Sequence, residues 1–304
     1  MKLKTWLAMF TIYTIWGSTY LAIRFMVETI PPFLGAGIRF LIPGTIIYIW
    51  RRLAGDQRPT KEQWRSTTII GLLLLVGGNG LLTWAEQRVP SGIAALLIGS
   101  VPLWMVLIEA LRKDGTRPSW KGVISLLTGF SGIILLIGPQ DILSPETHFE
   151  LIGLAACLIA ALLWSVGSIY SRTAILPKST LITTGMQMFA GSGALFLLSF
   201  LRGEWHNLHL PDITSRSIMG LGYLIVFGSL LGFVAYSWLL RNAPVSLIST
   251  YAYVNPLVAI ALGSWLAGEA LNVRIIISSI IIVSSVILIT IPGRRKIVYE
   301  EPLS

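Results

Sequence analysis

The chain has 304 residues, of which 54% are hydrophobic and only 12% are charged, and its mean hydropathy is +0.74. A soluble domain carries about 25% charged residues, so this composition excludes a soluble globular protein and indicates a membrane protein. The formal net charge of +9 does not indicate a nucleic-acid partner, because a basic excess in a polytopic membrane protein marks the loops that stay in the cytoplasm. The single cysteine, Cys157, can form no intramolecular disulfide and does not identify the redox compartment.

Ten apolar stretches each approach the length of about 20 residues that a helix needs to cross the hydrocarbon core. We predict membrane-spanning helices over residues 6–23, 33–50, 68–84, 92–111, 123–138, 151–170, 181–201, 217–240, 245–267 and 275–291. The first stretch resembles a signal peptide, but no small-x-small cleavage site follows it, so we predict that it is retained. The last is rich in β-branched residues, yet a lone strand leaves its backbone unpaired in lipid. The predicted fold class is an all-α polytopic membrane protein with ten transmembrane helices.

The two halves of the chain share a pattern of tryptophan and proline. In each half a Trp is followed by a Pro six residues later and by a second Pro twelve residues after that, at Trp84, Pro90 and Pro102 and again at Trp238, Pro244 and Pro256. A shift of 148 residues also places Trp16 on Trp164 and Arg39 on Gln187. Such self-similarity predicts an internal duplication, with residues 1–140 as the first repeat, 148–293 as the second and 294–304 as a cytoplasmic tail.

Lys and Arg are distributed unequally between the two sides of the predicted membrane. With both termini in the cytoplasm, seventeen lie on the cytoplasmic side and five on the other side, which favours this orientation in the cytoplasmic (inner) membrane. Five helices per half is an odd number, so the second half enters the membrane from the side opposite to the first. Inverted repeats of this kind are typical of secondary transporters, whose substrate site lies near the midplane between the repeats.

Polar and aromatic residues near the middle of the predicted helices form a candidate substrate-binding site. They are Trp16, Ser18, Asn79, Trp164, Ser168, Tyr251 and Asn255. Tyr251 and Asn255 are four residues apart and therefore share a helix face, and an aromatic ring beside an amide suits an organic solute with an apolar body and a polar end. Packing between helices accounts equally well for Trp16, Trp164 and Tyr251.

Two prolines and two charged residues are candidates for hinges or gates. Pro102 and Pro256 lie inside predicted helices, where a proline leaves a carbonyl group unpaired, so both helices are candidate cavity walls. The alternative is a kink that only shapes packing. Arg39 is expected to pair with Glu86 in an outer gate or to bind a substrate carboxylate, and a structural ion pair or a snorkelling arginine is the alternative. Glu269 is expected at the membrane interface.

Several motifs resemble the EamA family of the drug/metabolite transporter superfamily, in particular its bacterial drug/metabolite exporters and their amino-acid-exporting relatives. The motifs are Trp16-Gly-Ser-Thr-Tyr20, Gly37-Ile-Arg39-Phe40, Val89-Pro-Ser-Gly-Ile-Ala-Ala95, Tyr251-Ala-Tyr-Val-Asn-Pro256 and Gly268-Glu269. The resemblance covers nearly the whole chain and implies ten helices around a central cavity, with the fifth and tenth at the periphery, and export of small metabolites. The family typically has a Gly-Glu pair at the end of the fourth helix of each repeat; it is present here as Gly268-Glu269 but is replaced in the first half by Asp114-Gly115.

The leading hypothesis is a secondary transporter that exports amino acids or related amphipathic solutes by alternating access. A channel or an uncoupled facilitator is the first alternative, although a channel needs a continuous polar lining that these helices lack. A membrane-embedded enzyme is the second, but all three histidines fall in predicted loops. His206 and His209, between Glu204 and Asp212, are interpreted as an ordinary loop and not as a metal site. We expect a monomer in the bilayer with a small-molecule substrate, no metal and no cofactor, and Glu86 as the candidate for proton coupling.

Overall fold

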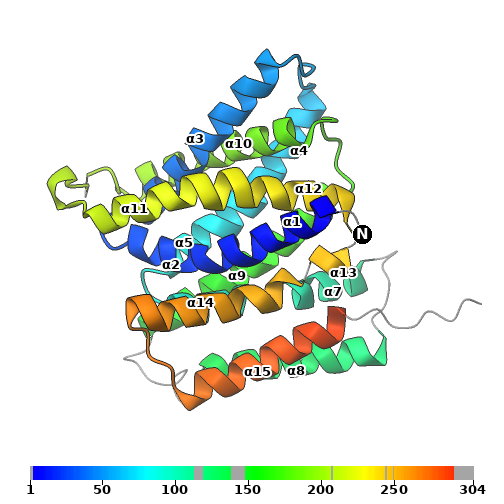
Figure 1. Cartoon of the computed structure of the whole chain (residues 1–304), viewed down its shortest axis with the longest axis vertical. Coiled ribbons are helices and arrows are strands. Elements are labelled where there is room, and N and C mark those ends of the chain that lie inside the picture. Colours follow the sequence, from blue (N-terminus) through cyan, green and yellow to red (C-terminus); the bar gives the residue numbers. More distant parts are fainter. Residues whose placement is uncertain are drawn as a thin grey trace, which may run out of the picture.

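The structure of the chain, a computed structural model, describes residues 3–112, 119–137, 148–206, 208–243, 245–248 and 250–290. Throughout these residues the regular secondary structure is helical, and they contain no strand (Figure 1). Seven helices are long and apolar enough to cross a membrane, and three shorter apolar helices accompany them. The predicted all-α fold with ten transmembrane spans is therefore confirmed. Pro244, the Asp114-Gly115 pair and the predicted tail 294–304 lie outside the described residues.

Five spans form the first half, and three of them are interrupted. In chain order they are α1 (Leu3–Thr11), the π-helix η1 (Ile12–Trp16) and α2 (Gly17–Met26); α3 (Pro32–Leu53); α4 (Lys61–Gly71), the π-helix η2 (Leu72–Gly80) and α5 (Leu81–Ala85); α6 (Ser91–Ile98) and α7 (Val101–Leu111); and α8 (Trp120–Ile137). The third span begins seven residues before its predicted start, because the Thr60 and Gln63 side chains form a capping box that extends the helix into a polar segment.

The second half has the same order of spans. They are α9 (His148–Ser171); α10 (Thr180–Leu201); α11 (Ser215–Tyr223), the π-helix η6 (Leu224–Phe233) and α12 (Val234–Asn242); α13 (Val245–Ile248) and α14 (Tyr251–Ala267); and α15 (Val273–Thr290), with the short 3-10 helix η5 (Leu210–Asp212) in the loop before α11. The third span of each half contains a π-helix, and the fourth is divided into two helices. These shared interruptions support a duplicated architecture.

Contacts between the halves follow a twofold pattern. Helix α3 packs on α10, α6 on α14 and α8 on α15, so the second, fourth and fifth spans each meet their own counterpart. The first span meets the eighth through α2 and α11, and the third meets the sixth through η2 and α9. Because the sixth and eighth spans are the counterparts of the first and third, the same twofold relation connects these two contacts. In Figure 1, α3 and α10 lie at one edge of the molecule and α8 and α15 at the opposite edge. The remaining six spans therefore form the centre.

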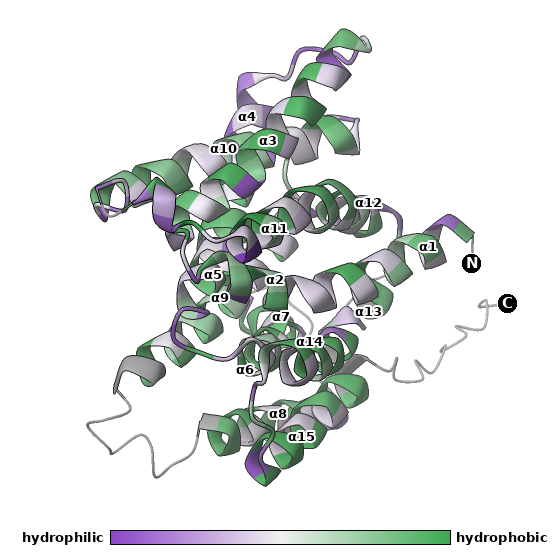
Figure 2. Cartoon of the chain, turned by 60° about the vertical axis from the view of Figure 1, so that its left-hand side comes forward, coloured by the Kyte–Doolittle hydropathy of each residue, from purple (hydrophilic) through white to green (hydrophobic). Residues whose placement is uncertain are grey.

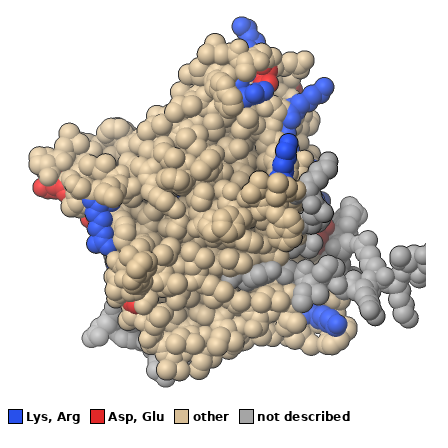
Figure 3. Space-filling view, viewed as in Figure 1, with Lys and Arg blue, Asp and Glu red and all other residues tan. Residues whose placement is uncertain are grey.

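The apolar surface suits a bilayer. Exposed large hydrophobic side chains are spread over most of the helices, including Leu127, Phe200, Trp265 and Ile280, and Figure 2 shows hydrophobic residues along the outer helices. In the space-filling view, charged residues gather toward two opposite ends, with a wide uncharged band between them (Figure 3). A band of this kind matches the hydrocarbon core of a membrane.

Glycine allows α3 and α10 to approach closely. A Cβ atom added to Gly185 of α10 lies 3.0 Å from the backbone nitrogen of Tyr48 and 3.2 Å from the carbonyl oxygen of Gly44, both in α3. Backbone atoms cannot move aside as a flexible side chain can, so a larger residue at this position separates the helices.

We predict that Gly185→Leu destabilises the protein by about 1–3 kcal/mol, the usual cost of overpacking. Gly193→Leu on the same helix is the matched control, because a Cβ atom at Gly193 meets nothing within 4 Å. Thermal unfolding of the purified variants in detergent measures the difference. Equal melting temperatures for the two leucine variants would show that this helix contact contributes little.

Candidate functional site

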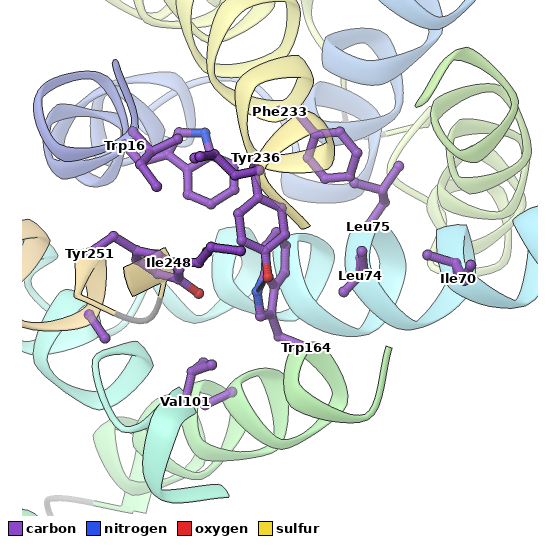
Figure 4. Packing of buried hydrophobic residues seen from close by; sticks show 14 of the residues in the cluster. Trp16, Ile70, Leu74, Leu75, Val101, Trp164, Phe233, Tyr236, Ile248 and Tyr251 are labelled. Atoms are coloured by element: carbon purple, nitrogen blue, oxygen red, sulfur yellow. Dashed lines mark hydrogen bonds between the residues drawn. The ribbon is translucent and has the colours of Figure 1, made fainter. Parts of the chain in front are cut away.

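Five aromatic rings from both halves pack together at the centre of the molecule. Trp16, the last residue of η1, lies 4.9 Å from the Tyr236 ring, 5.6 Å from Trp164 and 5.7 Å from Tyr251, measured between ring centroids. Phe233, at the end of η6, lies 6.3 Å from Trp164. Figure 4 shows the Tyr236 ring between those of Trp16 and Trp164. Most of these pairs are edge-on or tilted, as the charge distribution of aromatic rings favours. We call these five residues the aromatic cluster.

The polar tips of the aromatic cluster are bonded within the protein. The Trp16 indole nitrogen donates to the Gly228 carbonyl oxygen over 3.2 Å, and the Trp164 indole nitrogen donates to the Tyr236 hydroxyl oxygen over 3.2 Å. The Ser168 hydroxyl lies 2.9 Å from the same Tyr236 oxygen. These bonds fix the orientation of both indoles, so the rings offer mainly their apolar faces to a neighbouring molecule.

A central cavity lies against the aromatic cluster. Residues from both halves line it, including Trp16, Arg39, Asn79, Trp164, Gly228 and Tyr251. Its free space for water-sized molecules is about 50 Å³, whereas sites for organic ligands usually measure about 300–1,000 Å³. The cavity must therefore widen before an organic solute can enter.

Two larger spaces lie at opposite ends of α10. The first, which we call the Arg241 vestibule, has a volume of about 490 Å³ and is lined by Arg172, Lys178, Thr183, Gln187, Ser237 and Arg241, among others. The second, the Glu204 vestibule, has a volume of about 470 Å³ and is lined by Glu28, Pro32, Trp84, Arg88, Arg202 and Glu204, among others. Phe233 lines the cavity, Ser237 lines the Arg241 vestibule, and Tyr236 lines neither. The aromatic cluster thus separates the cavity from the Arg241 vestibule.

The predicted binding residues divide into two groups. Trp16, Asn79, Trp164 and Tyr251 line the cavity, whereas Ser18, Ser168 and Asn255 do not. The Ser18 hydroxyl donates to the Ile15 carbonyl oxygen and lies 2.6 Å from the Tyr223 hydroxyl. Ser168 is bonded to Tyr236, as described above. Depth in the membrane identified all seven residues, but the rotation of each helix decides which of them face the cavity.

Asn255 supports the first π-helix instead. It is 2% exposed, and with its amide oriented to satisfy its neighbours, the amide nitrogen donates to the carbonyl oxygens of Ile12 and Tyr13 in η1, each over 3.2 Å. A π-helix is a local widening that often marks functional sites. Because η1 ends at Trp16, Asn255 connects α14 to the segment that carries the central ring of the aromatic cluster.

We predict that Asn255→Ala lowers the free energy of unfolding by about 1–3 kcal/mol, because buried carbonyl groups lose their donor, and that it lowers flux. Asn242→Ala is the control, since Asn242 is exposed and donates only to the Trp238 carbonyl oxygen. Unfolding curves and transport rates of the two variants give the comparison. An Asn255→Ala protein with unchanged stability and flux would contradict this role.

Pro102 and Pro256 occupy different helical positions. Helix α6 ends at Ile98 and α7 begins at Val101, so Pro102 follows a break in the fourth span, whereas Pro256 lies inside α14. The two segments meet, because a Cβ atom on Gly99 would lie 2.8 Å from the Ala252 carbonyl oxygen and 3.1 Å from Pro256 Cγ. The fourth and ninth spans therefore cross at their irregular segments, and their role as hinges stays a prediction.

Arg39 and Glu86 do not form the expected ion pair. The Arg39 guanidinium lines the cavity, its Nε donates to the Ser229 hydroxyl over 3.3 Å, and its Nη1 has no hydrogen-bond partner. Glu86 is fully buried, and neither of its carboxylate oxygens has a hydrogen-bond partner. Arg39 is bonded instead to Ser229 of η6.

Two carboxylates connect the halves at the end of the molecule that contains the Glu204 vestibule. Glu204, after α10, accepts hydrogen bonds from the backbone nitrogens of Phe33 (3.2 Å) and Leu34 (2.8 Å) at the start of α3. Glu269, after α14, accepts from those of Ser91 (2.8 Å) and Gly92 (3.0 Å) at the start of α6. Free N–H groups and the helix dipole favour a negative charge there. Glu269 thus lies at a helix end, where it was expected, and has a contact that the sequence did not predict.

Glu204 has a counterpart that the sequence analysis missed. The shift of 148 residues that relates Arg39 to Gln187 also places Gly55-Asp56 on Gly203-Glu204, and both glycines have positive φ angles, a conformation that glycine adopts at low cost. Hydrogen bonds from Arg51 and then from Ser179, the N-cap of α10, hold the pKa of the Asp56 carboxyl below its usual value. Each half therefore has an acid that reaches the start of the second span of the other half.

Known proteins resemble this chain over nearly its whole length. The uncharacterized inner membrane transporter YedA of Escherichia coli K12 is 37% identical over 286 residues, which cover 93% of this chain and 90% of YedA. Protein PecM of Dickeya dadantii is 30% identical, and the match covers 97% of this chain and 96% of PecM. One solved crystal structure shares the fold, with a TM-score of 0.65 at 22% identity, over 96% of this chain and 98% of the solved chain.

The model of the EamA-like transporter family matches residues 3–138 and again residues 151–291. The two matches cover both halves and include every residue that lines the central cavity. They agree with the two-repeat architecture and with the cavity between the halves. The chain therefore belongs to the EamA-like transporter family.

Proposed function

We propose that this protein is a secondary transporter that exports amino acids or related amphipathic organic solutes across the cytoplasmic membrane by alternating access. The observation that carries the proposal is a small cavity built from both halves, with a vestibule at each end of the molecule. Rocking of one repeat against the other can open the cavity to one vestibule at a time. Trp16, Asn79, Trp164 and Tyr251 contact the solute in this mechanism, while Ser18, Ser168 and Asn255 hold the surrounding helices.

The proposed orientation places both termini and the Arg241 vestibule on the cytoplasmic side. This orientation follows the excess of seventeen Lys and Arg over five. We propose residues 1–140 and 148–293 as the moving repeats. Labelling of single cysteines from one side of intact cells tests the orientation, and it is simplified by the burial of Cys157, the one native cysteine.

Transport is tested with purified protein in liposomes. Amino acids, amphipathic cations and nucleobases are supplied with and without a pH gradient, and saturable flux supports a carrier. The pH gradient tests coupling, for which Glu86 is the proposed titratable group. Flux of every solute at the rate of empty liposomes would refute the transport proposal.

A reversible crosslink between the halves separates a carrier from a channel. The Arg216 guanidinium of α11 lies 3.3 Å from the carboxylate of Glu28, which lines the Glu204 vestibule. We predict that Glu28→Cys with Arg216→Cys, in a Cys157→Ala background, forms a disulfide that lowers flux about tenfold or more, and that a reductant restores it. The reduced protein is the control. A channel, which needs no such motion, would conduct equally with and without the crosslink.

A further inference from the structure

The central cavity contains one charged side chain. Among the described residues that line it, Arg39 is the only Lys, Arg, Asp or Glu, and the others are aromatic, aliphatic, small or neutral polar residues. A positive charge in the wall of a narrow apolar cavity repels a cationic solute and attracts an anionic one, and the effect is large because water is scarce there. Arg39 therefore gives the described lining of the cavity its positive charge.

The guanidinium of Arg39 is fixed in position but incompletely bonded. Arg39 is 3% exposed, its Nε is bonded to Ser229, and its Nη1 has no partner. The side chain lies close to η6, because a Cβ atom on Gly228 would be 3.1 Å from Nη2. A buried arginine without a bonded anion is costly in a membrane protein. Its planar group of N–H donors matches the two oxygens of a carboxylate.

No carboxylate of the described residues is bonded to Arg39. Glu86 forms no ion pair with it, and burial without a hydrogen-bond donor favours the neutral form of the Glu86 carboxyl group. Arg24, whose guanidinium donates to the Glu86 carbonyl oxygen, and Glu269 are the other charged groups whose fields act on Glu86. Glu86 therefore leaves the Nη1 donor of Arg39 free for a ligand.

Aromatic residues in the cavity lining suit an apolar body. Trp16, Trp164, Tyr251 and Phe233 line the cavity, and both indole N–H groups already have acceptors in the protein. Their faces can pack against an aromatic or branched aliphatic group. A cation can also bind an aromatic face, but here the Arg39 charge opposes it.

We infer that the central cavity binds an organic monocarboxylate with an apolar or aromatic body, with the carboxylate on the Arg39 guanidinium, and that it excludes amines that lack a carboxylate. The inference rests on the proposed transport function and specifies the charge of its substrate.

Binding of three matched probes to the purified protein in detergent tests the inference. The probes are 3-phenylpropionate, its methyl ester and phenethylamine, which share a phenyl ring and differ in charge, and binding is followed by calorimetry. We expect the carboxylate to bind at least about tenfold more tightly than the ester or the amine, the effect of a charge-assisted bond. Equal or tighter binding of the amine overturns the inference.

Variants then assign the effect to Arg39. Arg39→Gln is expected to weaken carboxylate binding about 10- to 100-fold, as loss of a hydrogen bond to a charged group does, and to leave ester binding unchanged. Arg65→Gln, which removes an exposed arginine of α4 that lines neither the cavity nor either vestibule, is the control and should bind all three probes as the native protein does. Unchanged carboxylate binding by a folded Arg39→Gln protein overturns the assignment.

A variant that keeps the positive charge decides the question if Arg39→Gln does not fold. Arg39→Lys loses the planar pair of donors and should bind the carboxylate more weakly than the native protein does, but still more tightly than the ester or the amine. Loss of this preference in a folded Arg39→Lys protein overturns the inference. Binding and flux remain separable: carboxylate binding without flux in liposomes refutes transport alone, whereas amine flux without carboxylate binding refutes the charge assignment alone.

Discussion

Replacement of Trp16 by alanine is expected to lower transport about tenfold or more while the protein still inserts into the membrane. Trp16 contacts Trp164, Phe233, Tyr236 and Tyr251, so its removal opens the centre of the aromatic cluster. Trp16 also lines the central cavity, and a loss of about 1.4 kcal/mol in contact with the solute already corresponds to a factor of ten in affinity. The effect should appear both in solute affinity and in the barrier toward the Arg241 vestibule.

Flux in liposomes, corrected for the amount of inserted protein, measures this effect. Trp265→Ala is the matched control, because Trp265 is 79% exposed and its loss creates no internal cavity. Trp16→Phe should retain part of the activity, since one ring still packs against its neighbours. If Trp16→Ala transports at the native rate with the native half-saturation concentration, the aromatic cluster is packing and not a substrate site.

Glu204 and Glu269 cap the starts of α3 and α6 with their carboxylates. The double substitution Glu204→Gln with Glu269→Gln is expected to favour opening at the end of the molecule that contains the Glu204 vestibule about tenfold or more. Each carboxylate accepts two backbone N–H groups across the boundary between the halves. A hydrogen bond to a charged group contributes about 1.5–3 kcal/mol, and glutamine keeps the shape while it loses the charge.

The rate at which a maleimide labels Ala160→Cys, in a Cys157→Ala background, measures the opening. Ala160 lines the central cavity and is fully buried, so labelling requires exposure of the cavity. Glu109→Gln is the control, because Glu109 pairs with exposed Arg112 and an exposed pair contributes little. Equal labelling rates with and without the caps would show that they do not hold this end closed.

Much of the architecture follows from the sequence because lipid restricts the choice of structure. A long apolar run must be helical, so ten spans and a duplication could be predicted from composition and the repeated Trp and Pro spacing alone. The same reasoning placed Trp16, Trp164 and Tyr251 at similar depths, and the packing of the halves brings their rings into one cluster.

The site could not be predicted in full, because the depth of a residue in the membrane does not show which way its side chain faces. Tyr236 lies in an apolar run without a recognisable pattern, and only the rotation of α12 places its ring between two tryptophans. The sequence also brought Arg39 and Glu86 to the same region, but it could not show that Ser229 holds Arg39 while Glu86 remains unbonded. Glu204 was detectable from the 148-residue shift that pairs it with Asp56, a signal hidden among loop residues.

The turns Gly55-Asp56 after α3 and Gly203-Glu204 after α10 differ in their access to solvent, and this difference has a kinetic consequence. Asp56 is paired with partly exposed Arg51, whereas Glu204 is 9% exposed and lies against the first turn of α3. Dissolved ions screen a partly exposed ion pair more than a buried hydrogen bond. Raising ionic strength should therefore loosen the turn at Asp56, which is held by its ion pair with Arg51, more than the turn at Glu204, so that salt changes the opening rates of the two ends unequally.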